Sequence, residues 1–392
     1  MDYNSNKNNL DKAIEISIII PCLNEEKAIS ACIDEAYKAI LKYKLSAEII
    51  VSDNGSSDNS LNIIKDKQKF IPNLILTEEK EKGYGFVYLK GLSLAQGKYI
   101  FMADGDNSYN FLEINKFIEK LEKGADLVIG NRFAGKMHYN AMPKIHKYIG
   151  NPILSYLVRV LFKTKIKDIH SGSRALRKDI LNQLNLKTGG MEFASEMIIK
   201  ASKKRLKVEE VEIEYRPRIG SSKLKTINDG WRHLRFILLY SPLALFLIPG
   251  SFLFILGIIS FIVFYFLPPE IMGIQLYFHP LFLSSLIITL GYQIIIFAAF
   301  AKIYAHNHLG DKDKKIEKMF KYLTIEKAGF TGIAFFLIGA LIYIFIFISW
   351  LKSDFPEINQ SKNFITALTL SILGIQTFFS AFMLSILGIK EK

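Results

Sequence analysis

The sequence Asp-Gly-Asp at Asp104 to Asp106 pairs two acidic residues with a spacing suited to metal chemistry. It directly follows an apolar segment, 98–103, that has the composition of a β-strand. Side chains two positions apart on an extended chain point the same way, so both carboxylates can face one point. Mg²⁺ and Mn²⁺ prefer such hard oxygen ligands, above all together with the phosphate oxygens of a substrate. Gly105 leaves room for a ligand, although two-Asp turns also occur in purely structural loops.

A second polar cluster, Asp-Asn-Gly-Ser-Ser-Asp at 53–58, stands where another apolar segment changes to a helical pattern. Asp53 could hold a hydroxyl of a nucleoside, whereas the serines and Asp58 could equally cap the following helix. Cationic side chains form a third group: Arg132, Arg174, Arg177, Arg216, Arg218 and Lys223. Arginine binds phosphate through two parallel hydrogen bonds. Taken one at a time, each of these cations could also be a solvated surface charge.

Strands and helices alternate along residues 16–129, and this alternation predicts where the polar clusters lie. Segments typical of strands occur at 16–21, 48–52, 74–77, 98–103 and 126–129, separated by helical patterns at 27–43, up to about 70, and at 84–95. The alternation predicts an α/β fold, a mostly parallel sheet covered by helices on both faces. Ligands bind beyond the carboxyl ends of the strands in such sheets, and the acidic clusters and Arg132 follow such ends.

The second half of the chain contains four apolar runs, at 244–267, 278–300, 328–351 and 364–387, without Asp, Glu, Lys or Arg in their interiors. A bilayer span needs about 20 apolar residues. The sequence therefore predicts a transmembrane domain with four spans over 244–392. We expect it to follow a polar tail (1–15), a soluble domain (16–224) and a juxtamembrane interfacial helix (225–243).

The charge of the loops predicts the orientation of these spans. The segment 302–327 holds seven lysines, whereas the two short loops on the other side hold two between them, Lys352 and Lys362. Lysine-rich loops stay in the cytoplasm. The sequence thus predicts an integral, multi-pass protein of a cell or inner membrane, with its N-terminal domain cytoplasmic. Aromatic and cationic residues at 229–235, and less clearly at 142–162, are typical of helices at the lipid headgroups.

The overall composition narrows the classes of partner. The formal net charge of +13 is compatible with nucleic acid, anionic lipid or a phosphate-bearing substrate. The cations are spread along the chain and apolar runs follow, which argues against nucleic acid. Only two cysteines occur, Cys22 and Cys32, and a cytoplasmic location predicts reduced thiols. Residues 1–15 contain no apolar stretch like that of a signal peptide.

Together these segments resemble family 2 glycosyltransferases of GT-A fold, in particular the polyprenyl-phosphate branch that includes dolichol-phosphate mannosyltransferase. The motifs that carry the resemblance follow in order at 21–25 (Pro-Cys-Leu-Asn-Glu), 51–56 (Val-Ser-Asp-Asn-Gly-Ser), 104–106 (Asp-Gly-Asp), 130–132 (Gly-Asn-Arg), 168–174 (Asp-Ile-His-Ser-Gly-Ser-Arg) and 218–224 (Arg-Ile-Gly-Ser-Ser-Lys-Leu). The resemblance implies a Rossmann-like catalytic domain that transfers a sugar from a nucleotide-sugar to a polyprenyl phosphate.

The resemblance also implies roles for individual residues. The residues expected to bind the nucleotide-sugar are Pro21, Leu23, Asn24, Glu25, Val51, Asp53, Gly105, Arg218 and Lys223. Asp104 and Asp106 would hold Mg²⁺ or Mn²⁺ on the donor diphosphate. The acceptor phosphate would be faced by Arg132, Arg174 and Ser171. Asp104, Asp106, Asp168 and Arg132 make up the expected catalytic set.

The chain departs from the family pattern at Ser108, where dolichol-phosphate mannosyltransferases often carry Gln. This departure leaves open the third metal ligand and the sugar. The implied reaction is inverting transfer of a hexose, glucose or mannose, from UDP or GDP. Its product is a lipid-linked sugar for glycan or glycoprotein assembly. A phosphate monoester has a second pKa of about 6, so the acceptor is already mostly dianionic and needs no strong base.

Two other classes of function fit parts of the sequence. A processive polysaccharide synthase could use the same fold, but the Gln-x-x-Arg-Trp stretch usual in such synthases is missing from the sequence. A catalytically inactive glycolipid-binding membrane protein is the other alternative, and the intact acidic pair argues against it. The sequence is compatible with a homo-oligomer. It does not indicate the length of the prenyl chain.

Overall fold

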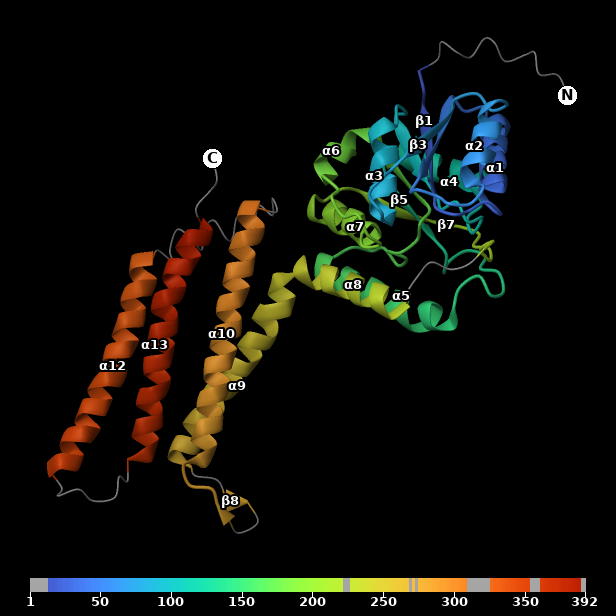
Figure 1. Cartoon of the computed structure of the whole chain (residues 1–392). Coiled ribbons are helices and arrows are strands. Elements are labelled where there is room, and N and C mark those ends of the chain that lie inside the picture. The colour runs from blue at the N-terminus through green and yellow to red at the C-terminus, as the bar shows by residue number, and fades with distance from the viewer. Residues whose placement is uncertain are drawn as a thin grey trace. The chain divides into compact units, whose positions relative to one another are not determined.

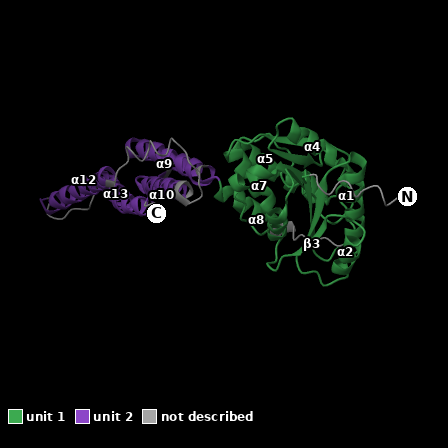
Figure 2. Cartoon of the chain, turned by 90° about the horizontal axis from the view of Figure 1, so that it is seen from above, with its two compact units in different colours: residues 1–240 green, residues 241–392 purple. Residues whose placement is uncertain are grey.

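The computed structural model describes residues 13–220, 226–267, 270–271, 274–308, 325–352 and 360–388. The chain divides into two compact units, Met1–Tyr240 and Ser241–Lys392, coloured separately in Figure 2. The boundary falls inside the segment 225–243 that the sequence assigns to a separate juxtamembrane helix.

The first unit is built on a seven-stranded sheet with the strand order β3-β2-β1-β4-β6-β5-β7. The strands are β1 (Ile16–Cys22), β2 (Ala47–Asp53), β3 (Leu74–Glu78), β4 (Tyr99–Met102), β5 (Leu127–Asn131), β6 (Arg174–Arg177) and β7 (Val208–Glu212). β6 pairs antiparallel with β4 and β5, and the other pairs are parallel. The predicted α/β fold with a mostly parallel sheet is confirmed.

The sequence predicts the first five strands but not β6 and β7. Arg-Ala-Leu-Arg in β6 has only two apolar residues, and Val-Glu-Glu-Val-Glu in β7 is mostly acidic. β6 lies between two strands and is buried there except for its last residue, but its four residues are too short to show a period. β7 is one of the two edge strands, where charged side chains are tolerated.

Helices cover both faces of this sheet (Figure 1). They are α1 (Ile29–Tyr43), α2 (Ser60–Gln68), α3 (Tyr84–Leu94), α4 (Ile114–Glu122), α5 (Asn151–Phe162), α6 (Leu181–Leu184), α7 (Phe193–Lys203) and α8 (Thr226–Leu239), with short turns η2 (Phe111–Glu113), η3 (His146–Gly150) and η4 (Lys178–Ile180). One core contains side chains of α1, α2 and α4, and the other contains side chains of α3, α5, α7 and α8.

The pleat of the central strand divides its side chains between these two cores. Ile18 and Ile20 lie in the first core and Ile19 in the second. Successive side chains of a strand point to opposite faces, and a strand buried on both faces reads as a continuous apolar run. This explains why Ile-Ser-Ile-Ile-Ile-Pro-Cys lacks the alternation of a half-exposed strand.

The second unit contains four helices long and apolar enough to cross a membrane: Ala244–Phe266, His279–Tyr304, Glu326–Lys352 and Ser361–Gly388. They correspond to η5 (Leu243–Leu247) with α9 (Ile248–Phe266), α10 (His279–His308), α12 (Ile325–Lys352) and α13 (Ser361–Gly388); β8 (Glu270–Ile271) and β9 (Ile274–Gln275) form a small hairpin. These helices and the predicted spans agree, which supports a membrane protein. Lys312, Lys314, Lys315, Lys318 and Lys321, on which the predicted orientation depends, lie outside the described residues.

Glycines allow the membrane helices to pack closely in pairs. A Cβ atom at Gly374 of α13 would lie 2.7 Å from the carbonyl oxygen of Gly332 on α12. One at Gly291 of α10 would lie 2.9 Å from the carbonyl oxygen of Gly250 on α9. Small residues at such contacts increase van der Waals packing between helices in lipid, where no hydrophobic effect drives helices together.

Candidate active site

A cavity of about 510 Å³ opens in the first unit where β1, β2 and β4 end. Its lining combines acidic, cationic, imidazole and apolar side chains: Pro21, Cys22, Leu23, Glu25, Asn54, Lys82, Gly83, Tyr84, Val87, Asp104, Gly105, Asp106, Tyr109, Arg132, His170, Gly190, Met191, Ala194, Tyr215, Arg218, Arg232 and His233. The cavity therefore lies at the carboxyl ends of parallel strands, as expected for this class of sheet.

Asp104 reaches the cavity directly after β4, and two tyrosines hold its carboxylate. The hydroxyls of Tyr84 and Tyr88 on α3 donate to the same oxygen, Oδ1, over 2.9 and 3.0 Å. Burial and the nearby charge of Asp106 raise the pKa of Asp104 above its usual value. A Cβ atom at Gly172 would lie 2.3 Å from Oδ2, so this close approach requires glycine.

Asp106 faces the same cavity but has different partners. Its Oδ1 accepts hydrogen bonds from the backbone N–H and the hydroxyl of Ser108, at 3.0 and 2.5 Å. Its Oδ2 is 2.6 Å from Nη2 of Arg218. Ser108, the residue at which the chain departs from the family pattern, therefore orients the second carboxylate of the pair.

The donor set fits a divalent cation that also binds a substrate. Asp104 and Asp106 bring two hard carboxylates to one cavity. Burial and the like charge of Asp106 raise the pKa of Asp104, and a bound cation would offset both effects. Across the described ranges, no cluster of three or more His, Cys, Asp or Glu side chains could hold a metal alone. The remaining ligands would have to be substrate oxygens or water.

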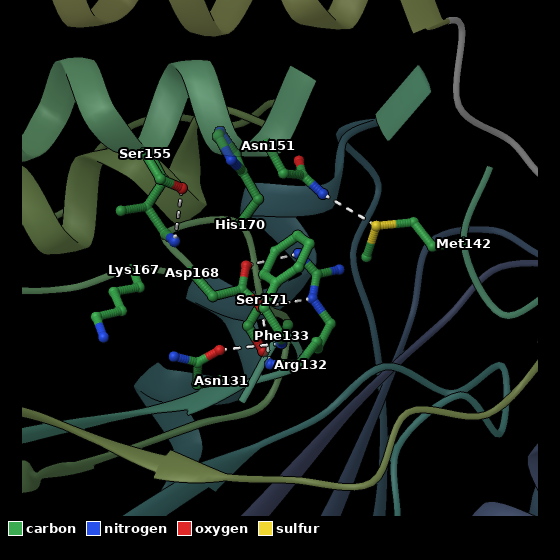
Figure 3. Close-up of polar contacts among 12 residues, drawn as sticks. Asn131, Arg132, Phe133, Met142, Asn151, Ser155, Lys167, Asp168, His170 and Ser171 are labelled. Carbon is green, nitrogen blue, oxygen red and sulfur yellow. Dashed lines mark hydrogen bonds and ion pairs between the residues drawn. The ribbon is translucent and has the colours of Figure 1, made fainter. Parts of the chain in front are cut away.

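Arg132 follows β5 and is held by Asp168 (Figure 3). Nε and Nη2 of Arg132 donate to the two carboxylate oxygens over 2.8 Å each, and the backbone N–H of Arg132 donates over 3.0 Å. The guanidinium also lies 5.1 Å from the ring centre of Tyr215. Asp168 is completely buried and does not line the cavity. The contacts of Asp168, an expected catalytic residue, therefore orient Arg132.

Arg174 is placed differently from the sequence-based expectation. Its guanidinium is buried and donates to the backbone carbonyls of Ser171, Ala194 and Ile169, at 2.8, 2.6 and 2.8 Å. Arg174 does not line the cavity, and each of its three guanidinium nitrogens binds a backbone carbonyl, so these contacts give Arg174 a structural role and do not place it at an acceptor phosphate. Ser171 is also buried and does not line the cavity, and its hydroxyl has no hydrogen-bond partner within the described structure.

The residues expected at the nucleotide divide into two groups. Pro21, Leu23 and Glu25, together with Gly105 and Arg218, line the cavity. The other described members, Asn24, Val51 and Asp53, do not. Lys223 lies outside the described residues.

The three residues that do not line the cavity have structural roles. Val51 is fully buried in the first core, because the pleat of β2 directs its side chain to that face of the sheet. Asp53 accepts hydrogen bonds from the backbone N–H groups of Gly55 and Ser56, at 2.7 and 2.9 Å, and therefore shapes the turn after β2. Asn24 accepts from the backbone N–H of Ser57 over 2.7 Å, which joins the loops after β1 and β2.

Several cavity residues are missing from the sequence-based set. Lys82 lies just after β3 and donates to the carbonyls of Asn54 and Gly55, at 2.5 and 3.1 Å. Its position after a predicted strand could have identified it. Arg232 and His233 also line the cavity but do not follow a strand, because they lie within the helix α8. Their place in the sequence therefore could not have identified them as cavity residues.

Comparisons with known proteins agree with this architecture. Residues 17–184 match Glycosyl transferase family 2, and residues 299–388 match the Glycosyltransferase family 2 C-terminal transmembrane region. The chain is 31% identical over 379 residues to the low-salt glycan biosynthesis hexosyltransferase Agl6 of Haloferax volcanii, covering 96% of this chain and 90% of that relative. It is 30% identical over 227 residues to dolichol-phosphate mannosyltransferase of Pyrococcus furiosus, covering 56% and 63%.

Among solved structures, glucosyl-3-phosphoglycerate synthase from Mycobacterium tuberculosis in complex with Mn²⁺, UDP-glucose and phosphoglyceric acid is similar at a TM-score of 0.47. The two chains are 18% identical, and the match covers 58% of this chain and 80% of the other. At this distance the likeness carries no argument about activity. The relation to Agl6 extends over nearly the whole length of both proteins, and on this ground the chain belongs to glycosyltransferase family 2.

Proposed function

We propose that this protein transfers a hexose, with inversion, from a UDP- or GDP-linked donor to a polyprenyl phosphate such as undecaprenyl or dolichyl phosphate. One observation carries the proposal: a single cavity is lined by the Asp104–Asp106 pair and by Arg132, in a chain that also contains four candidate membrane spans. The acidic pair suits the diphosphate of a donor with its cation. Arg132 suits the phosphate of an acceptor.

The donor side of the cavity is formed by the loops after β1, β2 and β4. Pro21 and Leu23 offer apolar surface to a nucleobase, and Glu25 offers a hydrogen-bond acceptor. Lys82 and Arg218 add positive charge for the diphosphate. Lys223, further along the segment after Arg218, remains proposed as a second cation that closes over the donor.

Arg132 is proposed as the residue that binds the acceptor phosphate. Asp168 holds Nε and Nη2, which leaves Nη1 for an anion and fixes the plane of the guanidinium. Both oxygens of Asp168 are committed to this contact, so Asp168 is not available as a general base. A phosphate dianion needs no such base at neutral pH, and this fits a phosphate acceptor better than a hydroxyl acceptor.

The protein's task in the reaction is to position two anions and to stabilise a leaving group. A phosphate oxygen of the acceptor attacks the anomeric carbon, the bond from that carbon to the diphosphate breaks, and its electron pair leaves with the nucleoside diphosphate. Arg218 lies beside Asp106, where it can stabilise the departing charge. Asp104 and Asp106 would hold Mg²⁺ or Mn²⁺, which supplies further positive charge at the diphosphate when bound.

The surface of the first unit supports attachment to a membrane. Tyr148, Ile149, Ile153, Tyr156 and Val160, on η3 and α5, are each more than half exposed. The last four recur at intervals of four, three and four residues, which places them on one side of a helix. Such a stripe suits a helix at the level of the lipid headgroups. The lysines of 302–327 support a cytoplasmic location of the catalytic unit.

A transfer assay with membranes containing the protein tests the proposal. The assay combines undecaprenyl or dolichyl phosphate, Mg²⁺ or Mn²⁺, and a panel of radiolabelled UDP- and GDP-hexoses. We expect label in the organic phase as a charged, mild-acid-labile glycolipid that disappears with EDTA. Asp104→Ala should lower its formation at least about 100-fold. The labelled donor that works identifies the sugar, for which glucose and mannose are the candidates.

Other outcomes of the same assay would support the alternatives. Label found only in insoluble polymer would support a processive polysaccharide synthase. No transfer from any donor, together with unchanged donor binding in Asp104→Ala, would support an inactive glycolipid-binding protein. Either result would overturn the proposed transfer to a polyprenyl phosphate.

A further inference from the structure

Helix α8 contributes two residues to the cavity that also contains the acidic pair. Arg232 and His233 line the cavity, and His233 is only 7% exposed. α8 packs against α5 and α7, and Ile237 on the same helix lies in the second core. His233 is therefore held inside the first unit, although its helix directly precedes the second unit in the chain.

His233 forms a pair with His170, which also lines the cavity. Their ring centres are 4.4 Å apart, and the ring planes are nearly perpendicular at 78°. Ser195, in the first turn of α7, lies beside both rings. Its Oγ is 3.1 Å from Nδ1 of His233 and 3.5 Å from Nε2 of His170. A hydroxyl can donate to one ring while it accepts from the other, so the two imidazoles are linked.

The groups around His170 are mostly cationic. Burial lowers the pKa of His170 well below its usual value, and His233, Arg132, Arg174 and His146 lower it further. His170 is therefore neutral at neutral pH in the absence of an anion. An anion bound beside these groups would act in the opposite direction and favour a protonated imidazole.

Asp168, the carboxylate that holds Arg132, cannot play this part. Both oxygens of Asp168 accept hydrogen bonds from Arg132, and Asp168 is fully buried. Figure 3 shows Asp168 directed at Arg132, with His170 nearby. Arg132, Arg232 and the two histidines line the same cavity, and this cationic and imidazole lining suits a ligand that carries its own negative charge.

We propose that Arg132, His170, Arg232 and His233 form a subsite for a phosphate monoester, the headgroup of the acceptor, and that its binding draws a proton onto the His170–His233 pair. This inference rests on the proposed function and deepens it. According to this proposal, α8, the helix that precedes the candidate membrane spans in the chain, helps to bind the headgroup.

The proton linkage distinguishes the acceptor from the product. The acceptor binds as a dianion, and after transfer its phosphate is a diester with one negative charge. The second charge leaves on the nucleoside diphosphate with the electron pair of the broken bond. The histidine pair then holds its proton less tightly and releases it as the product leaves. The subsite thus binds the acceptor more tightly than the product.

Steady-state kinetics of the full-length protein in membranes test the subsite. His170→Gln and His233→Gln should raise the KM for the lipid phosphate about tenfold, with kcat and donor KM within about threefold. In the natural protein the acceptor KM should rise with pH and level off above the pKa of the imidazole in the complex, because only the complex holds the proton below that pH. This rise should be absent in the variants. His138→Gln, a histidine paired with Glu214 outside the cavity, is the matched control and should change neither quantity.

The separate effects on KM and kcat distinguish a histidine that binds the acceptor phosphate from one that acts as a general base. A histidine acting as general base for a hydroxyl acceptor would lower kcat and leave acceptor binding unchanged, which would overturn the proposal. Ser195→Ala keeps both rings and should reduce the pH dependence of acceptor KM with kcat within about threefold. It provides an independent test if either histidine variant fails to fold.

Titration calorimetry of the detergent-solubilised protein counts the protons directly. Binding of farnesyl monophosphate is measured in two buffers of different ionisation enthalpy. The natural protein should take up about one proton on binding, and the histidine variants should take up none. A farnesyl methyl phosphate diester should bind without this uptake. A proton count of zero in the natural protein would overturn the linkage while leaving the proposed transfer intact.

Two further ligands distinguish the sources of the phosphate. Equal affinity for glycerol 3-phosphate, with the same proton uptake, would overturn the lipid headgroup assignment in favour of a soluble phosphate monoester. A protein that binds its nucleotide-sugar but not farnesyl monophosphate would contradict both this subsite and the proposed function.

Discussion

Arg132 and Asp168 form a buried ion pair in which three hydrogen bonds, from Nε, Nη2 and the backbone N–H of Arg132, converge on one carboxylate. The two side chains are 7% and 0% exposed. Removing one partner of such a pair leaves an uncompensated charge in a low-dielectric environment, whereas the intact pair contributes little net stability. The pair therefore fixes the geometry of Arg132 at the cavity.

We expect Asp168→Asn to lower the free energy of unfolding of the first unit by about 3–5 kcal/mol. The change leaves the Arg132 guanidinium buried without its counter-charge. The measurement is the thermal midpoint of the detergent-solubilised protein, which should fall by roughly 10 °C. The double variant Asp168→Leu with Arg132→Met should be more stable than Asp168→Asn. A loss below about 1 kcal/mol in Asp168→Asn would show that water reaches the pair.

Asp106→Asn should reduce kcat/KM by about 100- to 1000-fold, because it removes negative charge where a cation and Arg218 are proposed to act. The assay is sugar transfer into the organic phase, with donor binding measured in parallel. Asp66→Asn is the matched control, since Asp66 forms an exposed ion pair with Lys69 on the surface. Full activity in Asp106→Asn would refute the assigned role of the acidic pair.

Arg174→Met tests whether that arginine has a structural role or binds the acceptor phosphate. The variant leaves three buried carbonyl groups, those of Ser171, Ala194 and Ile169, without their donors. We expect the free energy of unfolding to fall by about 3 kcal/mol or more. The acceptor KM of the remaining folded enzyme should stay within about threefold of the natural protein's value. Arg132→Gln, by contrast, should raise the acceptor KM by more than this. A large rise in acceptor KM with unchanged stability would restore Arg174 to the phosphate site.

Glu214 should make the stability of the first unit depend on pH. Burial opposes its ionisation, but hydrogen bonds from His138, Arg216 and Asn110 lower the pKa of Glu214 from 4.5 to about 2. A depressed folded-state pKa stabilises the protein fully above pH 4.5, and this contribution is lost as the pH falls through about 2.

Glu214→Gln should therefore lower the thermal midpoint by roughly 2–4 °C at neutral pH. The difference from the natural protein should shrink as the pH falls below 4.5. Glu212→Gln, at an exposed position of β7, should show no such dependence. A difference that stays constant with pH would mean that the hydrogen bonds to Glu214 do not depend on its charge.

Tryptophan fluorescence tests contact between α5 and lipid. The two native tryptophans, Trp231 and Trp350, are first replaced by phenylalanine. In reconstituted vesicles, Ile153→Trp on the exposed side of α5 should be quenched by brominated lipid, because the stripe is proposed to lie among the headgroups. Leu41→Trp, at a position of α1 that is 49% exposed, is the control and should not be quenched. Equal quenching at both positions would count against a defined membrane-facing side.

Much of the fold could be predicted from local patterns. The five predicted strands and four helices long and apolar enough to span a membrane are all present, because each reads in the sequence as a mostly apolar run. β6 and β7 could not be predicted, since their few residues include Arg174, Arg177 and three glutamates. In the structure these strands are held by pairing with strands that are distant in the sequence.

The site was predictable where a residue's role follows from its place at a strand end. Asp104, Asp106 and Arg132 line one cavity, as the rule for parallel sheets predicts. Val51 and Asp53 also lie near the carboxyl end of a strand but do not line the cavity. The pleat directs Val51 into the core, and the carboxylate of Asp53 accepts hydrogen bonds from N–H groups of the following turn. Strand position indicates which end of the sheet a residue occupies, but not which contacts its side chain makes.

The sequence by itself determined the fold class, the membrane character and the acidic pair, since each depends on residues close together in the chain. Only the tertiary structure decided that Arg174 binds backbone, and that His170, Ser195 and His233 meet at the cavity. These three residues are contributed by a loop, α7 and α8, and their distances depend on how the helices pack. Packing depends on the complementary shapes of distant side chains, and no periodicity in the sequence records it.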